Sequence, residues 1–393
     1  MKHNFLKLIF NNSIFISIFY FVLILPRSIT LFPKLDNFFD ILSLLMYMFI
    51  IVVYILNKKY SKIQLYLFLF FFSLFIPTLF KSHDYMFYIK LYINYFSVSL
   101  FTELSIKYNF EVFYKGFKRV LSIFIIFNFV SLFLFPNGIM NIKEYYFLGY
   151  DNASIITIVI GTTILCALDT IKNGKLSKFT VFLVFISFLT YYLQWAVSCM
   201  VNIVLLILYI ILLNNDKFLF IKKRITIKKI TYLSLIIFLS LVFFRIQNIF
   251  EFLIVDILHK DLTITGRIYI WDRCIYYIRC NPIIGMGVYD YSTRTNLYNI
   301  YHAHSTYLHI LLEGGIVSLL AYLNIFFKLN KQINKLNFVD NKGLFILIFG
   351  IFSYFFSTLV DVIHNSQMIY ILFNLIFFYS IIRKDENYEN FSN

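Results

Sequence analysis

The stretch TGRIYIWDRCIYYIRCNPIIGMG spans residues 265–287, and HAHSTYLHILLEGGIVSLLAYL follows it at residues 302–323. The first stretch is polar and carries arginines, and the second passes from two histidines directly into an apolar run. Five basic or imidazole side chains gather here: Arg267, Arg273, Arg279, His302 and His304. The rest of the sequence has the composition of a membrane scaffold, so the chemistry of the chain is expected in this part.

The composition excludes a soluble globular protein. Hydrophobic residues make up 60% of the 393 residues and charged residues 14%. Apolar runs of about 18 residues recur, and each can cross about 30 Å of hydrocarbon as a helix. The formal net charge is +15, but the basic residues lie in short loops between apolar runs, which argues against a nucleic-acid partner. The four cysteines do not indicate a disulfide framework.

The apolar runs predict an all-α, polytopic integral membrane protein with a single membrane domain over residues 1–393. The first run is expected to be a span rather than a cleaved signal peptide, because its apolar core is long and Pro26 and Arg27 follow it. We predict twelve spans, at residues 8–25, 38–56, 63–80, 85–102, 118–136, 152–169, 178–195, 197–213, 229–245, 304–327, 343–361 and 366–383.

The lysines and arginines set the expected orientation. With both termini in the cytoplasm, the inner loops hold most of the 35 basic residues. The short outer loops hold only four of them: Arg27, Lys34, Lys81 and Lys143. The connection at residues 246–303, between the ninth and tenth spans, then lies outside. Because a long ordered connection is usually functional, we expect it to contain short helices and to form a cap over the active site.

Residues 266–280 predict a helix that ends at Asn281. At about 100° per residue, Arg267 and Arg279 flank an apolar stripe, and Arg273 points away. One interpretation is an interfacial helix with its stripe in the headgroup region and its arginines on lipid phosphates. The other is that Arg267, together with Arg279, binds a phosphate of the substrate, which the planar guanidinium suits. The stripe consists of Ile268, Trp271, Ile275 and Ile278.

The two histidines stand at the outer end of the predicted tenth span. A helix N-terminus disfavours a positive charge, which keeps His304 neutral, as a general base must be. The alternatives are that His302 and His304 anchor the interface, or that they form a metal pair, although carboxylate and cysteine ligands are missing nearby. No metal site is therefore expected.

Two further ionisable residues lie within predicted spans. Glu313 is about 13 Å deeper than His304 along a regular helix, too far for a direct pair, and is expected to be a buried structural acid paired with another helix. Lys90, near the outer end of the fourth span, can reach outward and is a candidate to contact an anion.

The residues of this region resemble the O-antigen ligase and polymerase superfamily. The signature of that family is a histidine with a small polar residue, a spacer of nine residues and then Gly-x-x-small. Ser318 takes the last place here, where Gly, Thr or Val is usual. The resemblance rests on Arg267, Trp271, the segment Asn281-Pro282-Ile283-Ile284-Gly285-Met286-Gly287, and His304-Ser305 followed by Gly315.

The resemblance implies a GT-C-like glycosyltransferase that acts without a metal or another cofactor. It implies transfer of glycan from undecaprenyl diphosphate with inversion, at the outer face of the bacterial cytoplasmic (inner) membrane. By position, Arg267 is expected to hold the diphosphate and His304 to activate the attacking hydroxyl. Arg279 and Lys90 are further candidates to bind the diphosphate. Four residues are expected to support the site: Arg273, His302, Ser305 and Glu313.

The chain departs from the family pattern at one place. The family often has a second arginine at the outer turn between spans seven and eight, and this chain has Gln194-Trp195-Ala196-Val197-Ser198 there. Either Lys90, Arg279 or another arginine of the long loop takes over that contact, or the diphosphate is held differently.

The favoured function is a Wzy-type polymerase that joins lipid-linked repeat units of an O-antigen, a capsule or a related surface polysaccharide. One alternative is an O-antigen ligase or oligosaccharyltransferase that moves the glycan to lipid A core or to protein. Another is a flippase or transporter, which predicts charged groups along several spans at mid-membrane, whereas this chain offers chiefly Lys90 and Glu313. The expected partners are the undecaprenyl-diphosphate-linked oligosaccharide, membrane lipids and a chain-length regulator, and no nucleic acid.

Overall fold

The computed structural model describes residues 9–57, 60–150, 154, 156–214, 225–246, 266–335, 341–358, 362, 364 and 366–383. Within these residues the chain is mostly helical, and a small antiparallel hairpin joins β1 (Tyr145–Tyr146) and β2 (Gly149–Tyr150). The first part of the predicted outer loop, at residues 247–265, lies outside the described residues.

The α-helices follow one another along the chain with short connections. They are α2 (Ser13–Leu23), α3 (Pro33–Asn57), α4 (Lys62–Pro77), α5 (Tyr85–Tyr108), α6 (Phe110–Leu134), α8 (Gly161–Asn173), α9 (Lys178–Leu193), α10 (Val197–Leu213), α12 (Ile227–Val242), α13 (Arg267–Cys280), α14 (Tyr291–Tyr298), α15 (Thr306–Ile333), α16 (Lys342–Thr358) and α17 (Gln367–Phe377). Short helical turns extend or join them at η1 (Arg27–Leu31), η2 (Thr78–Ser82), η3 (Ile139–Asn141) and η4 (Ile156–Ile160).

Five helices among the described residues are long and apolar enough to cross a membrane. Shorter apolar helices stand beside them, and every one of the twelve predicted spans contains an α-helix in this part of the chain. A mostly helical, polytopic membrane fold is therefore supported, and the number of spans and the GT-C-like fold stay predictions. The five long helices cover Pro33–Asn57, Lys62–Ser82, Phe110–Leu134, Ile156–Asn173 and Thr306–Ile333.

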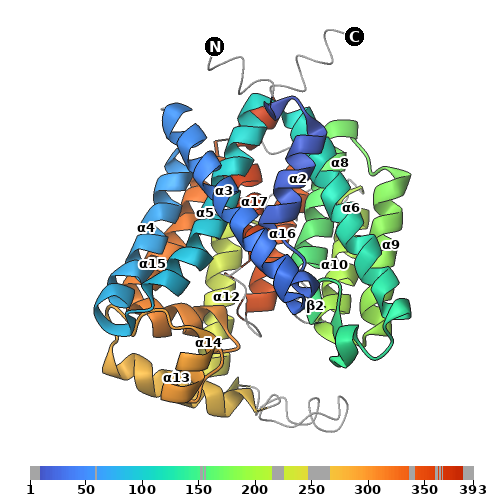
Figure 1. Ribbon diagram of the computed structural model, residues 1–393. Coiled ribbons are helices and arrows are strands. Elements are labelled where there is room, and N and C mark those ends of the chain that lie inside the picture. Colours follow the sequence, from blue (N-terminus) through green and yellow to red (C-terminus); the bar gives the residue numbers. More distant parts are fainter. Residues whose placement is uncertain are drawn as a thin grey trace.

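The two helices of the predicted outer loop, α13 and α14, lie together at one end of the bundle (Figure 1). Helix α2 begins and α17 ends at the opposite end. Helix α13 packs against α15, and α15 in turn packs along α4 and α12. The helices α13 and α14 are thus held on the bundle through α15.

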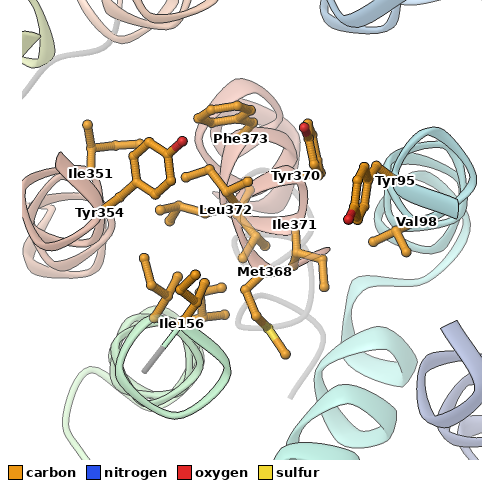
Figure 2. Packing of buried hydrophobic residues seen from close by; sticks show 14 of the residues in the cluster. Tyr95, Val98, Ile156, Ile351, Tyr354, Met368, Tyr370, Ile371, Leu372 and Phe373 are labelled. Carbon is orange, nitrogen blue, oxygen red and sulfur yellow. The ribbon is translucent and has the colours of Figure 1, made fainter. Parts of the chain in front are cut away.

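Helix α17 lies at the centre of the apolar core. Figure 2 shows its residues between α16, α5 and η4. The ring of Tyr370 stacks on Tyr95 of α5, with the centroids 5.5 Å apart. A buried polar contact joins three helices at the same level, where Asn374 accepts a hydrogen bond from Gln64 and donates one to Ser99. A helix that is apolar on all sides belongs in the middle of a bundle, and buried amides tie it to its neighbours.

Helix α15 is broken at Gly315, which corrects the expectation of a regular span over 304–327. Gly315 has φ 61° and ψ −163°, a conformation that only glycine adopts readily. The segment 282–287 inserts at the break and pairs with the backbone groups that the helix leaves unbonded. Four hydrogen bonds do this, from Met286 N to Leu312 O (2.8 Å), Gly287 N to Glu313 O (2.8 Å), Ile316 N to Pro282 O (2.9 Å) and Val317 N to Ile283 O (3.2 Å).

These hydrogen bonds require the backbone of segment 282–287 to lie very close to the backbone of α15. A Cβ atom added at Gly285 would lie 2.5 Å from the backbone of Glu313. Lys81 fixes the same segment from the η2 side, since its ammonium group donates to the carbonyl of Gly285 (2.8 Å) and to the side chain of Asn281. The segment 282–287 and the interrupted helix α15 therefore form one hydrogen-bonded unit.

Candidate functional site

Helix α13 agrees with the predicted helix at 266–280. Its apolar stripe, however, packs against the protein core rather than into the headgroup layer, because Trp271 is 1% exposed and Ile268, Ile275 and Ile278 pack against buried residues. The indole Nε1 of Trp271 donates to the carbonyl of Ala303 (3.1 Å), between the two histidines. Helix α13 thus fixes the position of the histidine segment.

His302 and His304 lie against each other just before α15 begins. Their ring centroids are 3.8 Å apart, and the backbone N–H of His304 donates to Nδ1 of His302 (3.3 Å). His304 has φ 47°, in the left-handed region that a side chain other than glycine seldom occupies. Such strained residues gather at functional sites, where the surrounding contacts hold them.

Both histidines are neutral near pH 7. Burial, together with the charge of Arg267, lowers the pKa of His304 from 6.5 to about 4. Burial and the neighbouring His304 lower the pKa of His302 to about 3. Arg267, the first residue of α13, therefore acts electrostatically on both imidazoles, and these three predicted site residues come together.

Ser305 is the N-cap residue of α15, but its side chain makes no capping hydrogen bond. The residue is fully buried, and its Oγ has no partner among the described residues. A buried hydroxyl without a partner costs about 1–3 kcal/mol, so this hydroxyl is placed to take a partner from elsewhere.

A buried ion pair joins Arg294 of α14 to Glu313 of α15, the helix that follows the histidines in the chain. Arg294 of α14 is 3% exposed, and its Nη1 contacts Oε1 of Glu313 (3.1 Å) and Nε2 of His309 (2.9 Å). His309 also contacts the same carboxylate oxygen (2.9 Å). The structure thus supports the expectation that Glu313 is a buried acid paired with a second helix, and Arg294 is its partner. The pair joins α14 to the turn of α15 that precedes the break at Gly315.

Several polar atoms around this pair have no protein partner among the described residues. They are Nε of Arg294, Oε2 of Glu313 and both ring nitrogens of His364, which stands between α16 and α17 with its ring 5.6 Å from His309. Because buried polar groups in proteins are almost always hydrogen-bonded, this region is suited to water or to polar groups of a substrate.

The other predicted site residues have different surroundings. Arg273 is exposed on α13 and donates to the carbonyl of Asn299 (3.1 Å), which ties α13 to the end of α14. Arg279 is exposed in the last turn of α13. Lys90 has a side chain 70% exposed and pairs with Asp40 of α3 at 2.6 Å.

Sequence reasoning did not single out Arg294, His309, His364 or Lys81 as site residues. His309 and Glu313 are four residues apart on one helix face, a spacing that brings side chains together and that could have indicated the pair. Arg294, His364 and Lys81 have no recognisable sequence pattern, because the residues that they contact are distant in sequence. Among the described residues, no group of three His, Cys, Asp or Glu side chains is placed to hold a metal ion.

These features define a polytopic, all-α membrane protein with two neutral histidines and an arginine gathered at one end of its helical bundle. Residues 147–323 match the family model described as O-antigen ligase, which agrees with the resemblance of this region to the O-antigen ligase and polymerase superfamily. The matched region includes α13, α14 and the histidine segment. Members of the family are glycosyltransferase-like enzymes, and the apolar helices agree with a bacterial integral membrane protein. The comparison with curated proteins found no match.

Proposed function

We propose that this protein is a polysaccharide polymerase that joins oligosaccharide repeat units carried on undecaprenyl diphosphate, for an O-antigen, a capsule or a related surface polysaccharide. The observation that carries the proposal is the neutral His304 beside Arg267, at the end of the bundle where α13 and α14 lie. A base with a cation close enough to act on its charge suits transfer of a sugar from a diphosphate.

In the proposed reaction, a hydroxyl of the acceptor sugar attacks the anomeric carbon of the donor sugar and forms the new glycosidic bond. The bond from that carbon to the diphosphate oxygen breaks, and the lipid diphosphate leaves with the electron pair. His304 takes the hydroxyl proton, and Arg267 stabilises the charge that develops on the diphosphate. A single displacement of this kind inverts the anomeric carbon and needs no metal.

The remaining site residues have supporting roles in this proposal. His302 packs on His304 and fixes its ring, and Ser305 offers a hydroxyl next to it. Arg294 and Glu313 hold α14 on α15. Arg273 fixes α13 to α14, and Arg279 and Lys90 are candidate contacts for the diphosphate or for lipid phosphates near it.

The site is proposed to face the outer side of the bacterial inner membrane, with both termini in the cytoplasm. The lysine-rich loops support this orientation. Both substrates are then tethered in one leaflet, which favours a site at the membrane surface. Membrane lipids and a chain-length regulator complete the proposed partners.

A ligase is the second candidate, favoured by the description of the matching family. It uses the same chemistry on another acceptor, such as lipid A core or a protein. A transporter is less well supported, because an exposed Lys90 pairs with Asp40 while the buried Arg294 and Glu313 pair with each other.

Deletion of the gene separates these functions. Loss of a polymerase leaves single repeat units on the final acceptor, loss of a ligase leaves polymer on the lipid carrier, and loss of a flippase leaves units on the cytoplasmic side. We expect single units, restored to polymer by the wild-type gene but not by His304→Ala. Polymer that accumulates on the carrier would identify a ligase instead.

A further inference from the structure

Tyr301 is an exposed ring in the segment that leads to the histidines. Asn299 ends α14 with φ 51°, and the next residue, Ile300, is 1% exposed and anchors the chain inward. Tyr301 then points outward with 57% of its surface exposed. Ala303 is buried again, and its carbonyl accepts the hydrogen bond from Trp271. The backbone on both sides of Tyr301 is therefore fixed.

The ring of Tyr301 is also held by other rings. It stacks on Tyr291 of α14, with centroids 5.0 Å apart and planes 23° apart. Its other neighbour is His302, with the centroids 5.3 Å apart, and His302 in turn contacts His304. Phe87 of α5 packs edge-on against Tyr291 at 5.9 Å. The ring of Tyr301 is therefore held by two neighbouring rings, and one side chain, His302, separates it from the candidate base.

A rigid exposed aromatic ring is suited to one face of a sugar. Pyranose rings have a face made of C–H bonds, which carry partial positive charge and pack against the electron-rich face of an aromatic ring. Tyrosine supplies such a surface at small cost in conformational entropy, since only two side-chain torsions must be fixed.

We propose that Tyr301, backed by Tyr291, is the stacking platform for a sugar ring of the acceptor glycan. The assignment to the acceptor follows from the neighbouring histidine and rests on the proposed function, because the hydroxyl that loses its proton must lie against His304. The ring of Tyr301 lies 5.3 Å from His302, whose ring lies 3.8 Å from that of His304, so Tyr301 and His304 can contact the same acceptor glycan. The platform thus orients the acceptor and excludes ligands without a sugar face.

The competing occupant of an exposed tyrosine in a membrane protein is the lipid headgroup layer. Tyr276 of α13 fits that role, since it is 64% exposed and its ring meets that of Tyr277 edge-on, with the centroids 5.2 Å apart. Tyr301 differs because it is clamped between a second ring and an imidazole of the site. Tyr276 is therefore the matched control, with similar exposure and no contact to the histidines.

The test measures binding separately from turnover. The probe is the repeat-unit saccharide released by mild acid from the lipid carrier of the host, titrated into purified protein in lipid nanodiscs. We expect Tyr301→Ala to weaken binding about tenfold, equivalent to about 1.4 kcal/mol. Tyr301→Phe, which keeps the ring, and Tyr276→Ala should stay within about threefold of wild type. In elongation assays, Tyr301→Ala should raise KM for the acceptor and leave kcat nearly unchanged.

Three results overturn the platform: no saccharide binding to the wild type, equal binding by wild type and Tyr301→Ala, or an equal loss in Tyr276→Ala. A fall in kcat at constant KM would also overturn it, since Tyr301 would then only position His302. Failure of the proposed function has a different signature. In that case the purified wild type does not elongate lipid-linked units, and deletion of the gene does not leave single repeat units on the acceptor, whatever Tyr301→Ala does to binding.

Discussion

At the scale of single residues, the charge state of His304 is set mainly by burial. The sequence predicts a neutral imidazole from its place before a helix. The structure attributes the low pKa first to burial and then to Arg267. The two arguments agree on the sign, but burial could not be predicted, because it depends on α13 folding over the histidine segment through Trp271.

The low pKa leads to a prediction about pH. A base with a pKa of about 4 is neutral from about pH 5 upward, so transfer activity should be level between about pH 5 and pH 8. Activity should fall only as the pH drops below about 5, where His304 gains a proton. Initial rates of purified protein, with intact folding checked by size-exclusion chromatography, measure this. A loss of activity centred near pH 6.5 would mean that the catalytic imidazole is exposed in the working enzyme.

Arg267 and Arg273 provide a comparison within one helix. Arg267→Ala should reduce elongation by about 10²–10³-fold, the usual loss when one donor to a developing anion is removed. Arg267→Lys should recover little of it, because the two-pronged contact is lost. Arg273→Ala removes only an exposed hydrogen bond to Asn299 and should stay within about threefold of wild type. Equal tolerance at both positions would show that Arg267 does not bind the diphosphate.

At the scale of elements, the break in α15 explains the glycines of the region. Gly315 has a positive φ, and a Cβ atom there would collide with the carbonyl of Ile283. Gly174 also has a positive φ, but nothing lies within 4 Å of its added Cβ. Gly174→Ala should cost about 1–2 kcal/mol of stability. Gly315→Ala should cost more, because the segment 282–287 must move as well.

Thermal unfolding of the two variants in detergent tests this account of the break. We expect a clearly lower Tm for Gly315→Ala than for Gly174→Ala, with loss of activity only in the former. Equal shifts in Tm would show that the contact between the segment 282–287 and α15 does not stabilise the fold.

Helices α13 and α15 also show which structural features can be predicted from the sequence and which cannot. The helix at 266–280 and its apolar stripe were predictable, because the spacing of Ile268, Trp271, Ile275 and Ile278 is local information. The break in α15 was not, since the hydrogen bonds that repair it come from a segment about thirty residues earlier. The pairing of Arg294 with Glu313 is non-local in the same way, and only the spacing of His309 and Glu313 was visible.

At the scale of the whole molecule, the orientation of the bundle decides whether the site can meet its substrates. Single cysteines at Asn296 in α14 and at Lys175 between α8 and α9 test it, in a background with the exposed Cys280 replaced by serine. An impermeant thiol reagent added to intact cells should label the cysteine at 296, and should label the one at 175 only after permeabilisation. The reverse pattern would place α13 and α14 in the cytoplasm.

The span pattern was largely predictable, because apolar runs of membrane length carry their own signal. The described helices fall on all twelve predicted runs, yet several are shorter than a bilayer requires, such as α2 and α17. Sequence hydropathy does not distinguish a full span from a partial one that neighbouring helices bury. The order of the helices around α17 is likewise a property of packing and not of any single run.

The central claim is that His304 is the general base of glycan transfer. The most direct measurement is elongation of lipid-linked repeat units by purified protein, comparing wild type with His304→Ala and His302→Ala. His304→Ala should bind the donor normally and transfer about 10²–10⁴-fold more slowly, the range for loss of a general base. His302→Ala, which removes only a packing partner, should retain substantial activity. Elongation by His304→Ala at a near-normal rate would contradict the mechanism.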